Sequence, residues 1–362
     1  MPDSIRSTVS RNIPINLKKI LRRVRRPIRR FRLRHTTQYH LFVFGGRGQY
    51  WVGVGQELYA KEPAFRATVQ ACETALAELG GPSLLANFDG TAGPDFLADE
   101  VRMQHLIVVV QVALTDLWRA QGIEPDASLG ISSGEAAAMY AAGGLTLRDT
   151  LRVSMSPALV CQVETATYGA LVINVAFEQA CSLAATCPVG LHVIQEADES
   201  RCCFFVKLTD MVAVKAYVQE RGFKAYQLRT PPIWPYHTPV LKQHEELLRE
   251  PLRPIQPLPT RKPCYLATLG QVVPVGTILD SAYWLLPPQL PVRMHQTLQA
   301  ALQDGYRVFT PLGVAPFPYS SVAGQREGLR GVELLSALAP ETPEWETFKQ
   351  TRETLADLGL KR

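Results

Sequence analysis

The chain has 362 residues, of which 46% are hydrophobic and 20% charged, a composition typical of one large globular domain or two smaller ones. It contains no run of eighteen apolar residues, so we expect no membrane-spanning helix. The formal net charge of +5 is unevenly distributed, because residues 1–34 hold twelve Lys and Arg and one acid, which leaves the remaining chain mildly acidic.

The first predicted element is a basic tail, residues 1–38. Between 14 and 34, apolar residues recur at helical spacing with arginines between them, and Pro27 interrupts the pattern. A basic amphipathic segment of this kind can lie on an anionic membrane surface, bind nucleic acid or dock on an acidic protein, and a solvated terminus without a partner is the alternative. We expect an acidic protein or a membrane surface as its partner, and no nucleic acid.

Strands and helices alternate after the tail, which predicts an α/β core with a parallel sheet. The core is assigned to 39–168 and 231–325, and a polar helical segment to 326–362. Its predicted strands are 39–46, 127–130 and 304–313, and its predicted helices are 56–79, 104–122 and 133–144.

Residues 169–230 have a rhythm of their own. The order strand, helix, two strands joined by the polar "DES", helix and strand is that of a ferredoxin-like unit. We therefore predict a small ferredoxin-like subdomain inserted into the α/β core.

The seven cysteines are odd in number and include no C-x-x-C spacing. This pattern argues against a disulfide framework and against a zinc site, and it fits reduced thiols. We expect a cytoplasmic protein, peripheral to the membrane if the tail binds one, with no bound metal.

The stretch "GISSG", residues 130–134, follows a short predicted strand and precedes an Ala-rich helix. A G-x-S-x-G sequence in this context predicts a nucleophile elbow, in which Ser132 is exposed on a sharp turn. The backbone N–H of Ser133 would lie at the start of the helix, where it would face an oxyanion formed on Ser132. An ordinary turn serine is the alternative.

A nucleophilic serine needs a base. Among the seven histidines, His237 stands out because it lies in the Pro-rich loop "PPIWPYHTP", directly after the inserted subdomain. Prolines fix such a loop and hold a side chain in place at low entropic cost.

Five sequence blocks resemble the malonyl-CoA:ACP transacylases and the acyltransferase domains of polyketide synthases. The resemblance covers about residues 39–340, and the nucleophile block is similar to the family's G-H-S-x-G-E core. In chain order the blocks are "FVFGGRGQYWVGVGQELYAKEPAFR", "QVALTDLWRAQGIEPDASLGISSGEAAAMYAAGGLTLRDTLR", "YHTPVL", "AYWLLPPQLPVRM" and "GYRVFTPLG".

The resemblance implies an α/β-hydrolase-like core and a Ser-His ping-pong acyltransferase. Ser132 matches the nucleophile and His237 the general base, and the backbone N–H groups of Arg47 and Ser133 fall on the oxyanion hole. The substrate would be an acyl-CoA or a phosphopantetheine-linked acyl group, with no bound cofactor. An acyl carrier protein, within polyketide or fatty acid-like biosynthesis, would be the partner.

The chain departs from the family pattern at three positions. Ile131 replaces the usual histidine before the nucleophile, Arg47 replaces a glutamine in the first loop, and Pro157 stands where malonyl-using members carry an arginine. A buried malonyl carboxylate needs a charged partner, so we predict an enzyme that does not prefer malonyl units. These residues, together with Gln111 and the bulky Tyr236, are the predicted substrate contacts.

Three alternatives remain open at this point. Arg47 could supply a relocated guanidinium for malonyl. The same Ser-His site could use water, which would make the protein an acyl-ACP hydrolase. A carrier-docking module without catalysis is the third alternative, motivated by Ile131 and Arg47.

Overall fold

The computed structural model describes residues 39–48, 50–314, 332–335 and 338–360, so the predicted basic tail lies outside the described residues. The core sheet has six strands in the order β10-β9-β1-β2-β7-β8. Neighbours in it are parallel except for β7 and β8, which form an antiparallel edge pair. The predicted α/β core with a parallel sheet is confirmed. The strands are β1 (Tyr39–Phe44), β2 (Ala127–Gly130), β7 (Cys264–Leu266), β8 (Gln271–Val273), β9 (Tyr306–Pro311) and β10 (Glu333–Leu334).

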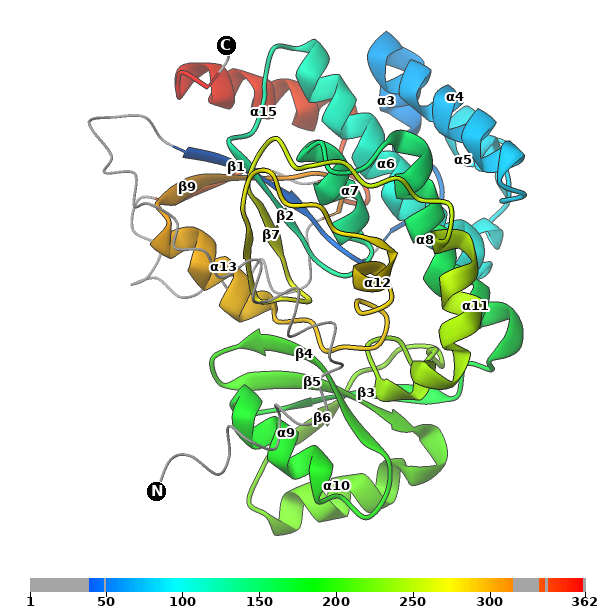
Figure 1. Cartoon of the computed structure of the whole chain (residues 1–362), viewed down its shortest axis with the longest axis vertical. Coiled ribbons are helices and arrows are strands. Elements are labelled where there is room, and N and C mark those ends of the chain that lie inside the picture. The colour runs from blue at the N-terminus through cyan, green and yellow to red at the C-terminus, as the bar shows by residue number, and fades with distance from the viewer. Residues whose placement is uncertain (1–38, 49, 315–331, 336–337, 361–362) are drawn as a thin grey trace.

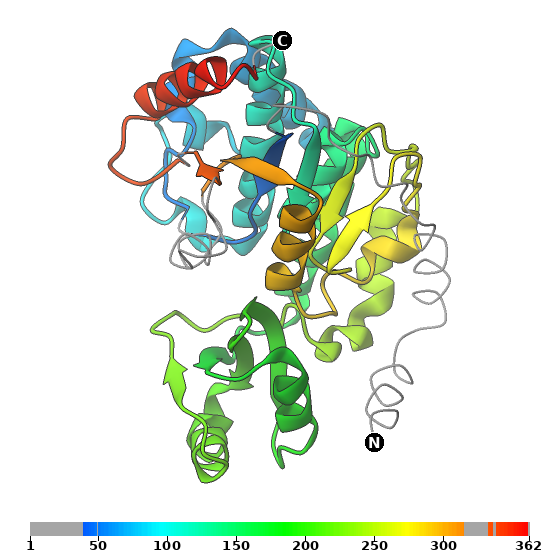
Figure 2. The same ribbon diagram turned by 90° about the vertical axis from the view of Figure 1, so that its left-hand side faces the viewer.

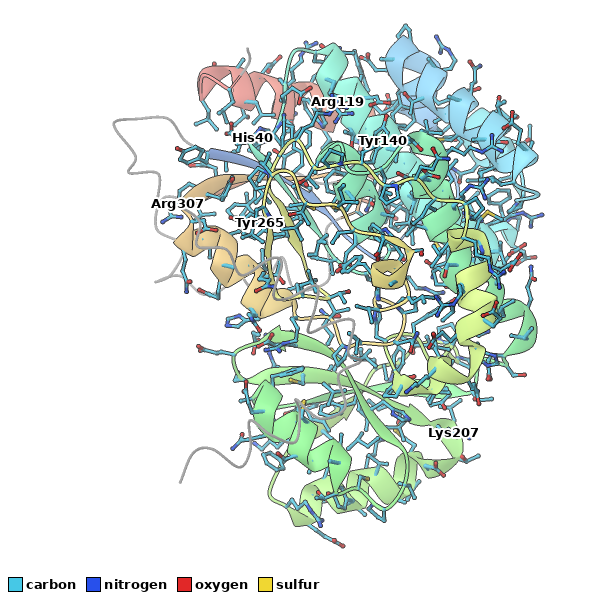
Figure 3. The ribbon with its side chains drawn as sticks, in the orientation of Figure 1. His40, Arg119, Tyr140, Lys207, Tyr265 and Arg307 are labelled. Carbon is cyan, nitrogen blue, oxygen red and sulfur yellow. The ribbon has the colours of Figure 1, made fainter. Side chains whose placement is uncertain are left out.

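Helices cover both faces of this sheet, as a parallel sheet requires. Successive side chains of β1 alternate between the faces: Phe42 and Phe44 pack with the larger set of helices, and Leu41 and Val43 pack with α13. Tyr265 of β7, labelled in Figure 3, lies on the α13 side of the sheet. Its hydroxyl donates a hydrogen bond to Asp304 at the end of α13 (2.6 Å). The larger set is α3 (Gln56–Lys61), α4 (Pro63–Glu78), α5 (Leu85–Asp89), α6 (Glu100–Ala120), α7 (Gly134–Ala141) and α8 (Leu147–Val163), and α13 spans Met294–Gln303.

Helix α6 passes through the middle of the larger core cluster and is buried along most of its length. It begins four residues before the predicted start at 104, because the Asp99 side chain caps it by accepting from the N–H groups of Val101 and Arg102. The predicted helix 56–79 is instead two helices. Pro63 forces Glu62 into an extended conformation and starts α4 as its first residue.

The inserted subdomain is a four-stranded antiparallel sheet in the order β4-β5-β3-β6, which confirms the predicted ferredoxin-like unit. Helices α9 and α10 cover one face of it. Figures 1 and 2 show the subdomain as a separate lobe at the foot of the core. Its elements are β3 (Tyr168–Ile173), α9 (Phe177–Ala185), β4 (Leu191–Asp198), β5 (Arg201–Lys207), α10 (Met211–Glu220) and β6 (Ala225–Gln227).

The C-terminal segment, predicted to be helical throughout, also contributes strand β10 to the core sheet. Helix α15 (Glu344–Asp357) then packs on the core, where Phe348 lies against Trp118 with ring centroids 4.6 Å apart. Two short helices, α11 (Glu245–Arg249) and α12 (Ser281–Trp284), complete the core. Over the described residues, none of the helices is long and apolar enough to cross a membrane.

Candidate active site

Ser132 sits on a sharp turn between β2 and α7 with a backbone φ of 56°, a left-handed conformation that is uncommon for a residue with a side chain. Close packing makes glycine necessary on both sides of it. A Cβ on Gly130 would lie 2.5 Å from the Cα of Glu135, and one on Gly134 would lie 2.2 Å from the carbonyl oxygen of Phe44. These contacts supply the physical reason for the G-x-S-x-G spacing.

The structure brings His237 to Ser132. The Nε2 of His237 and the Oγ of Ser132 are 2.7 Å apart, although the residues are separated by 105 positions in the chain. His237 also has a left-handed backbone, with φ of 62°. Its backbone N–H donates to the carbonyl of Pro288 (2.6 Å), which fixes the histidine loop against the segment that follows α12.

Backbone carbonyls set the tautomer of His237. Nδ1 lies 2.8 Å from the carbonyl oxygen of Pro287 and 3.2 Å from that of Leu290. A carbonyl can only accept, so Nδ1 carries the proton and Nε2 is left as the acceptor for the Ser132 hydroxyl. Burial lowers the pKa of His237 below its ordinary value, which keeps the ring neutral and able to act as a base.

The loop after β1 borders Ser132. A Cβ on Gly46 would lie 2.7 Å from the Cβ of Ser132 and 3.1 Å from its Oγ, so the backbone of the loop touches the serine. Gln111, predicted to contact the substrate, is instead fully buried beneath this loop and donates to the carbonyl of Gly45 (2.6 Å). Its role in the structure is to support the loop.

A cavity of about 1150 Å³ opens between the core and the inserted subdomain. The uncovered face of the inserted sheet lines one side of it, through Ala170, Ile194, Cys203 and Phe205. The core lines the other side with the predicted site residues Arg47, Ile131, Ser132, Ser133, Pro157, Tyr236 and His237.

The predicted acyl-binding position is uncharged. Pro157 lies inside α8 and its carbonyl accepts a hydrogen bond from the Tyr236 hydroxyl (3.3 Å), which also contacts the Sγ of Cys161 (2.6 Å). Tyr236 is buried and its ring forms part of the cavity wall.

Arg47 does reach the cavity, but its guanidinium is already paired. Its Nη1 lies 2.5 Å from the Oε2 of Glu100, whose side chain is only 3% exposed. A second cation, Arg229, lines the cavity from the exposed loop after β6. The sequence drew no attention to Glu100, because its partner lies 53 positions away.

Glu135 is a further residue that pattern reasoning did not single out. It is buried, accepts from the N–H of Thr268 (2.6 Å) and the hydroxyl of Tyr283 (2.7 Å), and so ties α7 to the segments after β7 and in α12. Burial raises its pKa to about 7. The acid directly after "GISSG" was the available signal, since it stands at the family's glutamate.

Potential metal ligands do not gather anywhere in the part of the chain that the structure describes, where no group of three or more His, Cys, Asp or Glu is placed to hold an ion. The site instead offers a serine hydroxyl on a strained turn, a neutral histidine in contact with it and an apolar cavity beside them. This arrangement suits acyl transfer through a covalent serine intermediate.

Comparisons with known proteins agree with acyl transfer. The chain is 30% identical over 291 residues to Polyketide synthase GfsA of Streptomyces halstedii, and 30% identical over 277 residues to Mycoketide-CoA synthase of Mycobacterium tuberculosis. These matches cover 80% and 74% of the chain but only 4% and 6% of the relatives.

Solved structures of similar fold include a loading acyltransferase from the avermectin modular polyketide synthase. It superposes with a TM-score of 0.74 at 25% identity, and the match covers 87% of this chain and 99% of that one. The protein-family model described as acyl transferase domain matches residues 41–359 of this chain. The chain therefore belongs to the acyl transferase domain family.

Proposed function

We propose that the protein moves an uncharged acyl group from a thioester to Ser132 and then to the phosphopantetheine thiol of an acyl carrier protein, in polyketide or fatty acid-like biosynthesis. The observation that carries the proposal is the 2.7 Å contact between Ser132 Oγ and His237 Nε2, inside a cavity large enough for an acyl thioester. The same contact argues against a docking module without catalysis.

In the first half-reaction His237 Nε2 takes the Ser132 proton as Oγ attacks the thioester carbonyl carbon. The backbone N–H groups of Arg47 and Ser133 would stabilise the oxyanion. Ser133 precedes the first turn of α7, so its N–H has no acceptor within that helix, which supports this assignment. The C–S bond then breaks, and His237 returns the proton to the departing thiolate. In the second half-reaction the carrier thiol repeats these steps in reverse on the acyl-serine.

Three features favour an uncharged acyl group. Pro157 has no N–H to offer a carboxylate, and the Tyr236 hydroxyl is already directed to the carbonyl of Pro157. Arg47 could reach a malonyl carboxylate only by breaking its ion pair with Glu100. The buried Glu100 carboxylate would then lie unpaired beside the carboxylate of the substrate. Arg47 is therefore a poor substitute for the arginine that Pro157 replaces.

Intact-protein mass spectrometry tests the proposal. The wild-type protein and the Ser132→Ala variant are incubated with acetyl-, butyryl- and malonyl-CoA, and then with a phosphopantetheinylated carrier protein. We expect an adduct on the wild type only, followed by appearance of the acyl group on the carrier. Loss of the adduct to water at the same rate with and without carrier would instead identify a hydrolase, and equal labelling of Ser132→Ala would overturn the nucleophile.

A further inference from the structure

We propose that a chain of four side chains, Arg47–Glu100–Gln104–Ser133, positions the two halves of the oxyanion hole relative to Ser132. Arg47 and Ser133 are the residues whose backbone N–H groups the proposed function assigns to the oxyanion, so the inference rests on that function. In this role Glu100 and Gln104 are positioning residues, which act through the two backbone donors and do not touch the substrate's reacting atoms.

The contacts form one continuous path. The Ser133 hydroxyl donates to Gln104 Oε1 (2.7 Å), and Gln104 Nε2 donates to Glu100 Oε1 (2.9 Å). The other oxygen of Glu100 accepts from Arg47 Nη1 (2.5 Å). Each donor meets an acceptor, and both carboxylate oxygens are used, so the path is fully satisfied from one loop to the other.

Glu100 and Gln104, the middle of this network, are held rigidly by helix α6. Glu100 and Gln104 are one turn apart at the start of α6, and both are 4% exposed. The positive end of the helix dipole also favours a carboxylate at the first helical residue. Gln111, two turns further along α6, donates to the carbonyl of Gly45 and so ties the first loop to the same helix at a second point.

The ion pair at the end of the network is half open to solvent, because the Arg47 side chain is 44% exposed. Exposed ion pairs contribute little to the stability of a fold. Removal of Arg47 has a larger effect inside the protein, because it leaves the buried Glu100 carboxylate without its charged partner. The expected consequence is a shift of the loops that carry the oxyanion donors, with catalysis affected more than folding.

The network also distinguishes two roles for Arg47. If Arg47 binds the carboxylate of a substrate, its removal changes the use of malonyl donors alone. If it positions the first loop, its removal slows every donor by the same factor, since all donors form the same oxyanion.

The test uses diethyl 4-nitrophenyl phosphate, which reports on the oxyanion hole without any acyl donor. The Ser132 oxygen attacks phosphorus while His237 Nε2 takes its proton, negative charge builds on the phosphoryl oxygen, and the bond to 4-nitrophenolate breaks. The proteins compared are the wild type, Arg47→Gln, Glu100→Gln, Ser133→Ala and the double variant Arg47→Gln/Glu100→Gln. Glu124→Gln is the matched control, because Glu124 pairs with Lys262 outside the cavity.

We expect Arg47→Gln and Glu100→Gln each to lower the first-order rate constant of Ser132 phosphorylation about tenfold, and Ser133→Ala severalfold. The double variant should be no slower than the slower single variant, because either substitution alone already interrupts the hydrogen-bonded path. Arg47→Lys should recover most of the rate. With acetyl- and malonyl-CoA, kcat should fall by the same factor while KM stays within twofold.

A Glu100→Gln rate within twofold of the wild type overturns the positioning role, as does a loss confined to malonyl donors or an equal loss in Glu124→Gln. If the wild type is not phosphorylated at Ser132, the proposed function fails and the positioning role falls with it. The wild-type reaction therefore distinguishes failure of the proposed function from failure of the positioning role alone.

Discussion

Ser132 and His237 meet at 2.7 Å, and both hold left-handed backbone conformations, with φ of 56° and 62°. Each conformation is uncommon for a residue with a side chain, and each is maintained by close packing or by hydrogen bonds to neighbouring segments. The two residues come from loops on either side of the inserted subdomain, so their contact depends on the folded core and on no local sequence feature. Strain at both partners is consistent with a site organised for chemistry.

The contact of Gly46 with Ser132 leads to the first expectation. In Gly46→Ala the new methyl group would lie 2.7 Å from the Cβ of Ser132, and a resulting displacement of the serine by about 1 Å should lower the acylation rate about 100-fold. Acylation is measured by intact mass, and folding by the thermal unfolding midpoint. Gly93→Ala is the matched control, because its Cβ would meet nothing within 4 Å, and an equal loss in both variants would contradict the account.

A second expectation concerns pH. Burial lowers the pKa of His237 below 6.5, so the acylation rate should be constant above pH 7 and fall with an apparent pKa below 6.5. The unfolded chain binds more protons than the folded one between the lowered pKa and 6.5, so stability should also fall as pH falls through this window. A pH profile of acylation checks the first part, and an apparent pKa above 7 would contradict it.

The buried pair of Glu135 and Tyr283 gives a third expectation. Tyr283→Phe removes a donor from a buried carboxyl group and should cost about 1–3 kcal/mol of unfolding free energy. The pKa of Glu135 is raised to about 7, so the carboxylate form, which needs the donor most, becomes dominant above that pH. Urea unfolding at pH 6 and pH 8 should therefore show a larger loss at pH 8, and an equal or smaller loss there would argue against the pairing.

A fourth expectation follows from Pro157. Pro157→Arg places a guanidinium in the cavity beside Tyr236, where it can pair with a malonyl carboxylate. Such a charge-assisted contact is worth about 1.5–3 kcal/mol, so kcat/KM for malonyl-CoA relative to acetyl-CoA should rise tenfold or more. Pro157→Gln controls for loss of the proline, and a similar rise in both variants would show that charge is not the cause.

Local pattern was sufficient to predict strands β1, β2 and β9 of the core sheet, the inserted subdomain and the turn at Ser132, but it missed β7, β8 and β10. "GISSG" lies between a short strand and a helix, and the rhythm of 169–230 depends on neighbouring residues alone. His237 was found because a proline-rich loop and a family motif mark it. These features are encoded within short stretches of chain, which is why reasoning from sequence reached them.

The remaining features depend on pairings between distant residues. Glu100 acquires its role from its ion pair with Arg47, 53 positions earlier, and neither segment carries a sequence pattern that indicates this pairing. Gln111 was predicted to contact the substrate, but only the packing of α6 under the first loop shows that its side chain meets the carbonyl of Gly45. The break at Pro63 is different, since its signal was present in the sequence and was outweighed by the apolar periodicity around it.

The central claim is that the acyl group is uncharged, and a competition experiment tests it most directly. Wild-type protein is mixed with equal amounts of acetyl-CoA and malonyl-CoA, the reaction is stopped early, and the two Ser132 adducts are quantified by mass. We predict an excess of the acetyl adduct of about tenfold or more. An equal yield, or an excess of the malonyl adduct, would contradict it and would make Arg47 the residue to examine next.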